Sequence, residues 1–298
     1  MYESSYQEVL MRMAAATFLL VVLVGSVLAF ATDSDLILYF HGGWGNINIY
    51  TIPVAGGSPA QLTRNAGNNL DPEWSPDGTQ IAFQSDRDGA DAIYVMSADG
   101  SDQALLTPPG VVGRQPSWSP DGTQIVFTSS IAVAVMNSDG TDIRNLTPSS
   151  LRAWNPKWSP DGTRIVFETD RDGDAEIYVM NADGSEIMQL TSNDIDDQQP
   201  VISPDGTQIA FNSSEPGRSD FDLYIMNIDG SNVRRITTQA DNDEYPSWSH
   251  DGRQIVYAYG NAAIYVINVD GTGRRRVTTP LFWTAQPSWQ PTSNEQTE

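Results

Sequence analysis

Four carboxylates stand at alternate positions in one short segment of the chain, namely Asp170, Asp172, Asp174 and Glu176. Carboxylate oxygens are preferred Ca²⁺ ligands, and alternate spacing is a feature of calcium-binding loops. The segment lacks the twelve-residue helix–loop–helix frame of an EF-hand. We therefore predict a calcium site at these four residues, and we expect no other cofactor to be required. The alternative is a solvated acidic rim that keeps an exported protein soluble.

A second set of polar residues precedes a proline that recurs along the chain. Its members are Asp71, Gln115, Asn155, Gln199, Tyr245 and Gln286. Most carry amide or acid groups, which can form hydrogen bonds with a peptide or hold an ordered ion; ordered water could use the same groups. We predict that these six residues, together with Asp170, Asp172 and Asp174, are the binding residues of the protein.

Residues for catalysis are few. The two histidines, His41 and His250, lie far apart, and the chain has no cysteine and no Gly-x-Ser-x-Gly nucleophile motif. A pair of carboxylates could still hydrolyse a glycosidic bond, because acids are abundant. The pattern as a whole favours a protein that binds without catalysing a reaction.

The elements that position these residues are repeated. The motif Trp-Ser-Pro-Asp-Gly begins at Trp74, Trp118 and Trp158, with degraded copies at Ile202, Trp248 and Trp289, so the repeats are 40 to 46 residues long. Each contains short β-branched and aromatic runs bounded by Gly, Asp, Pro and Ser, which is typical of antiparallel strands. Four strands per repeat of this length are typical of a propeller blade.

The ends of the repeat array indicate how it closes. The first repeat lacks a Trp strand of its own, whereas the segment around Trp289 is a strand without a repeat after it. Pairing the two would remove the open edges of a linear array. The predicted fold is all-β: a six-bladed β-propeller closed by the C-terminal strand and preceded by a signal peptide or membrane anchor helix.

Length variation is confined to one loop in each repeat. The segment between the second and third predicted strands has from 6 to 12 residues, while the other spacings are constant. Variable loops on a fixed scaffold are where binding sites usually lie. In an up-and-down blade these loops and the connections between blades share one face, so we predict that this face binds the partner.

The repeat is similar to that of a known family. The run from Asn155 to Phe167, followed by Asp170-Arg171-Asp172-Gly173 and by Ile177 to Gly184, closely resembles the TolB-type propeller repeat. The resemblance covers residues 35–290. It implies an exported protein- or peptide-binding module of the cell envelope, and we expect a TolB-like propeller without the N-terminal α/β domain of TolB. The alternative is a propeller that binds carbohydrate or acts on it as a lyase or hydrolase.

Composition limits the choice of partner. The formal charge is −22. So acidic a chain repels the phosphates of nucleic acid and attracts cationic groups, so we expect an envelope protein or a basic peptide as partner, and no nucleic acid. The absence of cysteine excludes disulfides and thiolate metal sites. We expect a monomer.

The N-terminus differs from the repeats. Residues 14–31 are almost wholly apolar, follow Arg12, and end in Ala29-Phe30-Ala31, which fits a signal-peptidase site. An uncleaved anchor at residues 14–31 is the alternative, and it would be the chain's one contact with the membrane. We therefore divide the chain into a signal peptide or anchor (1–31), a propeller (32–290) and a polar C-terminal tail (291–298). Either alternative predicts a periplasmic or extracellular protein.

Overall fold

The computed structural model describes residues 35–43, 45–65, 67–214, 220–238, 241–279 and 284–291. All of them belong to one compact unit, Asp35–Glu298. The expected signal or anchor segment, and the expected tail beyond Pro291, lie outside the described residues. No helix within the described ranges is long and apolar enough to span a bilayer.

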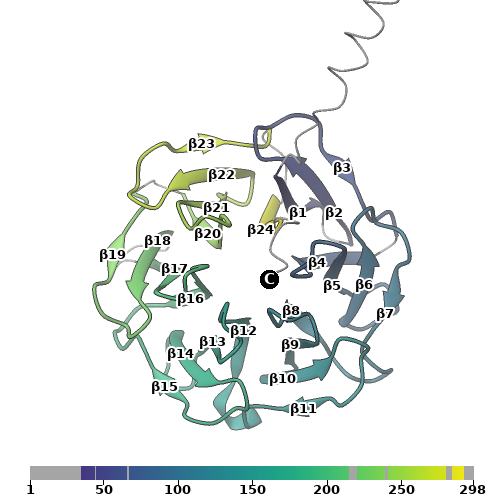
Figure 1. Ribbon diagram of the computed structural model, residues 1–298, viewed down its shortest axis with the longest axis horizontal. Helices are drawn as coiled ribbons and strands as arrows, with labels where there is room; N and C mark the ends of the chain where they lie inside the picture. The colour runs from purple at the N-terminus through teal and green to yellow at the C-terminus, as the bar shows by residue number, and fades with distance from the viewer. Residues whose placement is uncertain are drawn as a thin grey trace, which may run out of the picture. The chain divides into compact units, whose positions relative to one another are not determined.

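Short antiparallel strands arranged as blades around a central axis make up this unit (Figure 1). The innermost strands are β4 (Gly67–Trp74), β8 (Arg114–Trp118), β12 (Ala153–Trp158), β16 (Asp197–Ile202), β20 (Asp243–Trp248) and β24 (Thr284–Trp289). The second strands are β1 (Leu36–Gly43), β5 (Gln80–Ser85), β9 (Gln124–Ser129), β13 (Arg164–Thr169), β17 (Gln208–Ser214) and β21 (Gln254–Tyr259).

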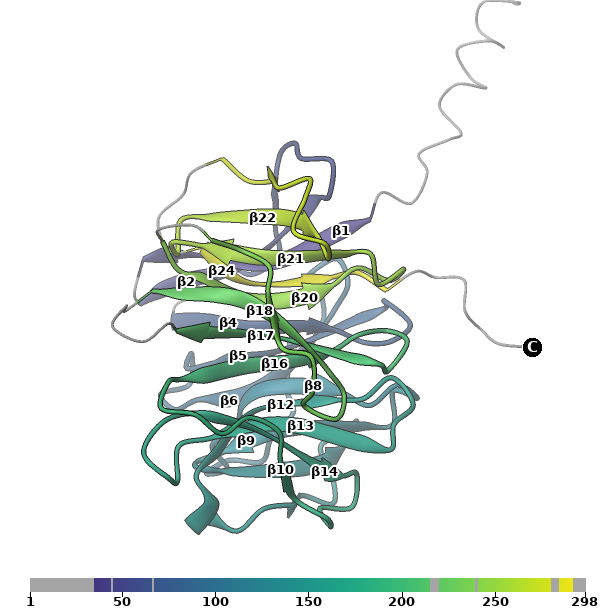
Figure 2. The same ribbon diagram turned by 90° about the vertical axis from the view of Figure 1, so that its left-hand side faces the viewer.

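The outer half of each blade follows the same order. The third strands are β2 (Asn46–Pro53), β6 (Ala92–Ser97), β10 (Ala132–Asn137), β14 (Glu176–Asn181), β18 (Phe221–Asn227) and β22 (Ala263–Asn268). The outermost strands have two residues each: β3 (Ala60–Gln61), β7 (Ala104–Leu105), β11 (Arg144–Asn145), β15 (Met188–Gln189), β19 (Arg234–Arg235) and β23 (Arg275–Arg276). A short 3-10 helix, η1 (Ser149–Leu151), precedes β12. From the side, the strands cross the thickness of the propeller from one face to the other (Figure 2).

The sheets correct the prediction of six separate blades. Four sheets are separate blades of four strands, whereas the remaining eight strands form one sheet in the order β24-β1-β2-β4-β5-β6-β7, with β3 paired to β2. The joint is a short parallel pairing of β2 with β4, in which Asn46 lies opposite Gly67 and Ile47 opposite Asn68. Asn69 Nδ2 strengthens it by donating to the carbonyl of Ile47 at 2.9 Å. The prediction of six separate blades was therefore wrong. Residue spacing within a repeat does not reveal a pairing between neighbouring repeats.

The last strand pairs with the first. β24 lies antiparallel to β1, with Trp289 opposite Ile37 and Thr284 opposite His41. The pairing joins strands from the two ends of the described chain and removes the edge that each would otherwise expose. His41 lies within β1 and contacts Tyr50.

The core lies between blades. The aromatic residue of each second strand is fully or almost fully buried, as at Phe83, Phe127 and Tyr257. The indoles of Trp74 and Trp118 are 4% and 6% exposed and pack beside these rings. Burial of each such side chain contributes roughly 1.5–3 kcal/mol. The repeated Trp is therefore a core residue at these positions.

Aspartates of the repeated turn have a structural role. In the first complete copy, Asp77 accepts hydrogen bonds from the hydroxyl of Ser75 at 2.6 Å and from the amide of Thr79 at 3.0 Å. The Ser75 hydroxyl bond is the main cause that lowers the pKa of Asp77. The same bonds recur at Asp121, Asp161 and Asp205. These carboxylates hold the hairpin closed.

Candidate functional site

The six polar residues before the repeated proline share an unusual backbone conformation. Their φ angles are all positive, between 47° and 58°: Asp71, Gln115, Asn155, Gln199, Tyr245 and Gln286. Each lies where the register of the innermost strand shifts against the second strand. Such a bulge redirects the chain locally, and a left-handed conformation costs a non-glycine residue of order 1–2 kcal/mol. The structure brings all six together as the lining of one axial cavity of about 350 Å³.

Hydrogen bonds link the members of this ring between blades. Gln115 Oε1 accepts the backbone amide of Asn155 at 3.2 Å, and Gln199 Oε1 accepts that of Tyr245 at 2.7 Å. Thus the side chain in one bulge satisfies the backbone amide of the bulge in the next blade. The ring holds the innermost strands together, which offsets the strain of the bulges. Its side chains are consequently already partnered before any ligand arrives.

Glu168 completes the ring between two blades. Its Oε2 accepts the amide of Gln199 at 2.6 Å, and its Oε1 accepts Asn155 Nδ2 at 2.8 Å. Burial is the largest effect on this carboxyl and raises the pKa of Glu168 to about 7, with further raising by Asp196 and Asp170. Sequence reasoning did not single out Glu168. Its position, four residues after Arg164 in β13, carries no signal that it would reach the axis.

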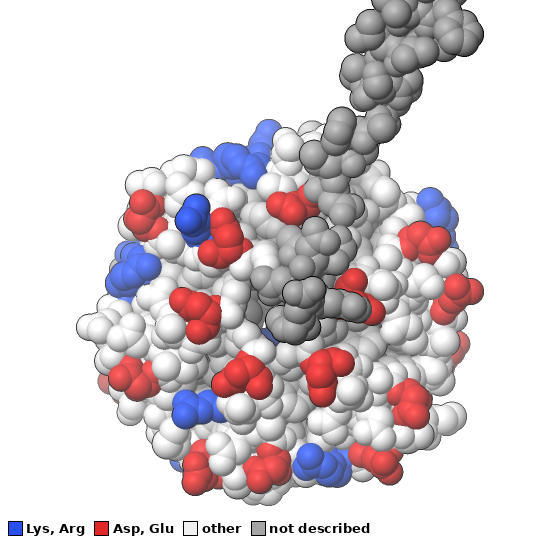
Figure 3. Space-filling view, viewed as in Figure 1, with Lys and Arg blue, Asp and Glu red and all other residues white. Residues whose placement is uncertain are grey.

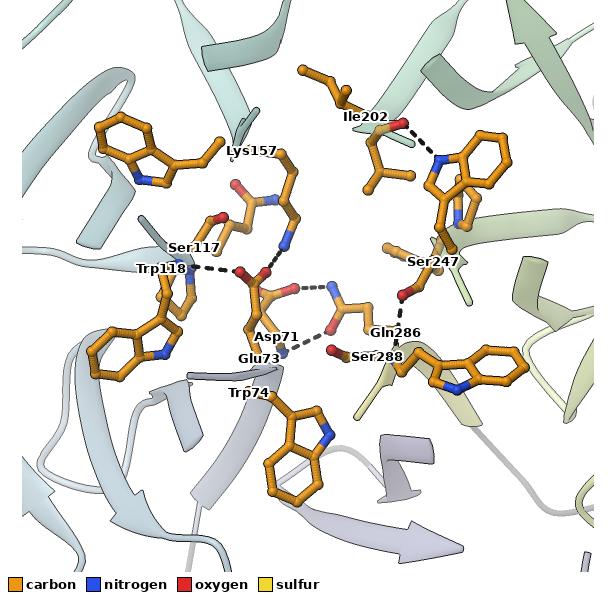
Figure 4. Close-up of a pocket in the computed structure, with 18 of the residues that line it drawn as sticks. Asp71, Glu73, Trp74, Ser117, Trp118, Lys157, Ile202, Ser247, Gln286 and Ser288 are labelled. Carbon is orange, nitrogen blue, oxygen red and sulfur yellow. Dashed lines mark hydrogen bonds and ion pairs between the residues drawn. The ribbon is translucent and has the colours of Figure 1, made fainter. Parts of the chain in front are cut away.

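The next layer of the cavity holds an ion pair that crosses the axis. Lys157 in β12 pairs with Glu73 in β4, and Glu73 Oε1 also accepts the amide of Trp118 at 3.1 Å (Figure 4). Lys157 is the only lysine in the sequence. In the same close-up, Asp71 and Gln286 form two hydrogen bonds with each other beside this pair. Sequence reasoning did not identify Glu73 or Lys157, because they occupy a position where the other repeats have Ser or Val.

Beyond this layer the walls of the cavity are mainly apolar. Prolines of the repeated turns and indoles of the innermost strands line it, namely Pro76, Pro120, Pro160, Pro204, Pro291, Trp74, Trp118, Trp158, Trp248 and Trp289. The cavity thus has an apolar mouth on the side of the Ser-Pro-Asp-Gly turns. Its charged groups, among the described residues that line it, are Asp71, Glu73 and Lys157.

Three of the four predicted calcium ligands have partners of their own, whereas Oδ2 of Asp174 is buried without a hydrogen bond. Asp170 forms a two-bond ion pair with Arg152, at 2.7 and 2.8 Å, and Asp172 pairs with Arg171 at 3.0 Å. Glu176 is buried, and its Oε1 accepts the amide of Asn193 at 2.6 Å. In the described part of the chain, no group of three or more His, Cys, Asp or Glu residues has an arrangement that could hold a metal ion. Calcium binding at these four residues therefore stays a prediction.

Two junctions between blades contain a pair of buried carboxyl groups. At one, Glu176 and Asp197 are 3% and 2% exposed; at the other, Asp222 and Asp243 are both fully buried. The equivalent residues of the other junctions are Asn48 with Asn69, Ala92 with Gly113, Ala132 with Ala153, and Ala263 with Thr284. The side chains at the other four junctions are thus uncharged, and these two junctions differ from them by having carboxyl groups.

The second of these pairs is poorly solvated. The hydroxyl of Thr237 donates to Asp222 Oδ1 at 3.3 Å, and Arg235 pairs with Asp222 at 2.5 Å. Both carboxyl oxygens of Asp243 lack a hydrogen bond of normal geometry. Burial is the main cause that raises the pKa of Asp243 to about 7, and the nearby Arg274 lowers it only in part. A carboxyl group so placed is favoured in its neutral form.

Three further aromatic side chains are only partly exposed. Trp154, Phe221 and Tyr245 are each partly buried, and Tyr245 contributes to the axial cavity. Arg152 lies over the ring of Trp154 at 5.7 Å.

Charged side chains are spread around the face seen in Figure 3, where acidic groups are more numerous than basic ones. This distribution agrees with the strongly negative formal charge.

Comparison with known proteins was consistent with this architecture. The sequence profile described as "TolB beta propeller domain" matches residues 25–153, 150–260 and 200–296. The Tol-Pal system protein TolB of Desulfosudis oleivorans is 38% identical over 58 residues, which are 20% of this chain and 13% of that protein. The crystal structure of TolB from Acinetobacter baumannii is 25% identical with a TM-score of 0.77, and the match covers 87% of this chain and 67% of that one.

A lyase is also among the similar folds. An oligogalacturonate lyase solved in complex with manganese is 17% identical, with a TM-score of 0.59 over 83% of this chain and 74% of that one. At this level of identity the likeness concerns the fold alone.

Proposed function

Because this chain belongs to the TolB beta propeller domain family, we propose that it is an exported, non-catalytic module that binds a protein or peptide in the cell envelope. The observation that carries the proposal is a constant scaffold with one variable loop per repeat. The loop between β5 and β6 spans residues 86–91 and that between β13 and β14 spans 170–175, whereas β9 and β10 are separated by residues 130–131 alone. The turns at the other end of the same strands keep one length.

Charge indicates the kind of partner. The long loop after β13 exposes carboxylates, with 60% of the Asp172 side chain and 32% of the Asp170 side chain accessible. The equivalent loop after β5 presents Asp91, which is paired with Arg114 at 2.6 Å. Exposed carboxylates on a protein of formal charge −22 attract cationic groups and steer their approach. We propose a basic peptide or a basic surface of an envelope protein as the partner.

Charge reversal on one face at a time tests the proposal. Asp170→Lys, Asp172→Lys and Asp174→Lys combined should abolish capture of the partner by crosslinking in envelope extract. The matched control is Asp102→Lys, Asp142→Lys and Glu186→Lys, which changes the net charge equally in the second hairpins at the other end of the strands. Loss of capture in the control alone would assign binding to the opposite face and overturn the proposal.

The absence of catalysis can be tested separately. His41 in β1 and His250 in the turn between β20 and β21 belong to different sheets. The double variant His41→Gln, His250→Gln should capture the partner as wild type does. Turnover of a polysaccharide or peptide by the purified protein, abolished by Glu168→Gln, would place the chain among enzymes instead.

A further inference from the structure

Arginines are concentrated on one part of the propeller rim. Three equivalent segments, each beginning at a glycine, have six arginines and no acidic residue: 56–66, 230–240 and 271–281. The corresponding segments of the other repeats, 100–110, 140–150 and 184–194, have four acidic residues and one arginine. We call the six residues the arginine arc: Arg64, Arg234, Arg235, Arg274, Arg275 and Arg276. In a chain of formal charge −22, such a separation of charge defines a distinct surface.

The arginine arc follows the outer edge of the molecule. The strands β19, β23 and β3 succeed one another around the rim (Figure 1), and basic side chains gather over β19 and β23 (Figure 3). Arg234 Nη1 donates to the carbonyl of Val269, in the hairpin before β23, at 2.8 Å. Arg275 Nη1 donates to the carbonyl of Val54, directly after β2, at 2.7 Å. Arginines thus join β19 to the next repeat and β23 to the first.

Three members of the arginine arc are available to a ligand. Arg64, Arg234 and Arg276 are exposed, and none of them has an ion pair within the described residues. The others have internal partners: Arg235 pairs with Asp222 at 2.5 Å, and Arg274 Nε donates to the Tyr257 hydroxyl at 2.6 Å. Asp270 lies near Arg234, and its carboxylate accepts the amide and the hydroxyl of Thr272. Because the arc has six arginines beside these two carboxylates, its net charge is positive.

We propose that the arginine arc binds anionic phospholipid headgroups and holds this part of the rim against a membrane. A guanidinium group forms paired hydrogen bonds with phosphate oxygens and keeps its charge at physiological pH. The proposal goes beyond the capture of an envelope protein or peptide, which we assign to the carboxylates of the variable loops. It gives the chain a membrane contact in addition to the apolar residues 14–31.

The first residue of the propeller indicates why a membrane is the partner. The carbonyl of Asp35 accepts the amide of Val54 at 2.8 Å, and Val54 is the residue that Arg275 contacts. Asp35 stands four positions after Ala31, the last residue of the apolar segment. Four residues of extended chain span at most roughly 14 Å. An apolar segment that stays uncleaved in a bilayer therefore keeps the lipid headgroups within reach of the arginine arc.

The negative charge of the whole protein does not prevent this contact. Charges are screened over about 8 Å at physiological ionic strength, so a headgroup at the arc interacts mainly with the arginines beside it. Each arginine near an anionic surface strengthens binding about fivefold, and three strengthen it about a hundredfold. This attraction adds to that of a tether, because stable membrane anchoring takes two signals.

Site-specific labels on the full chain test the proposal. The chain has no cysteine, so Thr279→Cys beside β23 gives a single labelling site, and Ser192→Cys gives the equivalent exposed site beside β15. The fluorescently labelled protein would be reconstituted in phosphatidylcholine vesicles, with or without phosphatidylglycerol, that carry a nitroxide quencher on the headgroup. We expect quenching at position 279 that requires phosphatidylglycerol and is lost in about 1 M sodium chloride, where the screening length is about 3 Å. Position 192 should show little quenching.

Arginine variants assign the quenching to the arc. Arg64→Gln, Arg234→Gln and Arg276→Gln combined should lower the ratio of quenched to unquenched label about a hundredfold. The matched control is Arg144→Gln, Arg164→Gln and Arg253→Gln, which removes three exposed arginines outside the arc. An unchanged Tm would show that each triple variant is folded. Where the purified protein lacks residues 1–31, co-sedimentation with the same vesicles gives the comparison.

Several outcomes would overturn the proposal. Equal quenching with and without phosphatidylglycerol, or no quenching at position 279 in either vesicle, would show that the arc does not bind anionic lipid. Equal losses in the two triple variants would mean that net charge alone controls the contact. Absence of vesicle binding, with retention on polyglutamate that only the arc variant loses, would assign an acidic protein surface instead. Partner capture is a separate measurement: capture without quenching contradicts the arc alone, and quenching without capture contradicts the proposed function alone.

Discussion

Asp71 and Gln286 are 215 positions apart in the chain, yet they form a reciprocal pair of hydrogen bonds at the axis. The amide of Asp71 donates to Gln286 Oε1 at 2.8 Å, and Gln286 Nε2 donates to Asp71 Oδ1. The pair joins β4 near the start of the described chain to β24 at its end. The closure of the propeller thus depends on side chains at the axis as well as on the pairing of β24 with β1.

Removal of Gln286 should weaken this closure. Gln286→Ala leaves the buried amide of Asp71 without its acceptor, which costs about 1–3 kcal/mol. We expect a lower midpoint in urea unfolding with an unchanged slope. Gln189→Ala, at an exposed position in β15, is the control and should leave the midpoint unaltered. Equal midpoints for wild type and Gln286→Ala would contradict a structural role for the pair.

Deletion of residues 284–298 should have a much larger effect. It removes β24 and leaves β1 as an open edge, and it uncovers the core cluster that contains Ile37 and Ala285. We expect a severe fall in Tm and binding of a dye that detects exposed apolar surface. A melting curve like that of wild type would show that β24 does not close the structure.

One threonine hydroxyl per repeat should contribute separately to stability. In each repeat it accepts the backbone amide of the residue 14 positions earlier, as Thr147 does for Val133 at 2.9 Å. Thr147→Val keeps the shape of the side chain but leaves that buried amide unpaired, so we expect a loss of about 1–3 kcal/mol in the free energy of unfolding. Thr279→Val, at an exposed site, serves as the control. A change below the error of the unfolding curve would mean that water replaces the hydroxyl.

The buried carboxyl of Asp243 should make stability depend on pH. Its pKa is raised from 3.8 to about 7, mainly by burial, so the folded state holds a proton that the unfolded state has released between these values. The contribution of Asp243 to the free energy of unfolding is consequently greatest below about pH 4, and it is lost as the pH rises to about 7. Asp243→Asn should make Tm depend less on pH than in wild type, and at pH 8 the variant should have a higher Tm than wild type.

A turn aspartate provides the control of opposite sign. The pKa of Asp161 is lowered, chiefly by the hydroxyl of Ser159. Its contribution is present at neutral pH and is lost as the pH falls. Asp161→Asn should therefore reduce Tm at pH 7 more than at pH 3. A pH profile of Asp243→Asn parallel to that of wild type would show that Asp243 is ionised in the folded state.

The sequence by itself determined the repeat, the strands and the turn chemistry. A fixed spacing of Trp, an apolar triplet and Gly-containing turns fixes local structure, because each of these signals acts over a few residues. It also identified one recurring polar position, and the structure places its six residues at the axis, since a position that recurs in every repeat must recur around the ring: Asp71, Gln115, Asn155, Gln199, Tyr245 and Gln286. The TolB-like character of the propeller follows from the same recurrence.

Only the tertiary structure decided how the repeats join and which charges meet. The parallel pairing of β2 with β4 merges two sets of strands into one sheet, and it depends on Gly67 and Asn68 lying beside the start of β2. Lys157 and Glu73 belong to different repeats and meet across the axis, where no spacing along the chain could place them. Likewise, Asp222 and Asp243 are ordinary acids in the sequence, and burial at a junction between blades changes their chemistry. Contacts between repeats depend on how the ring closes. The periodicity of the sequence describes each repeat but does not predict these contacts.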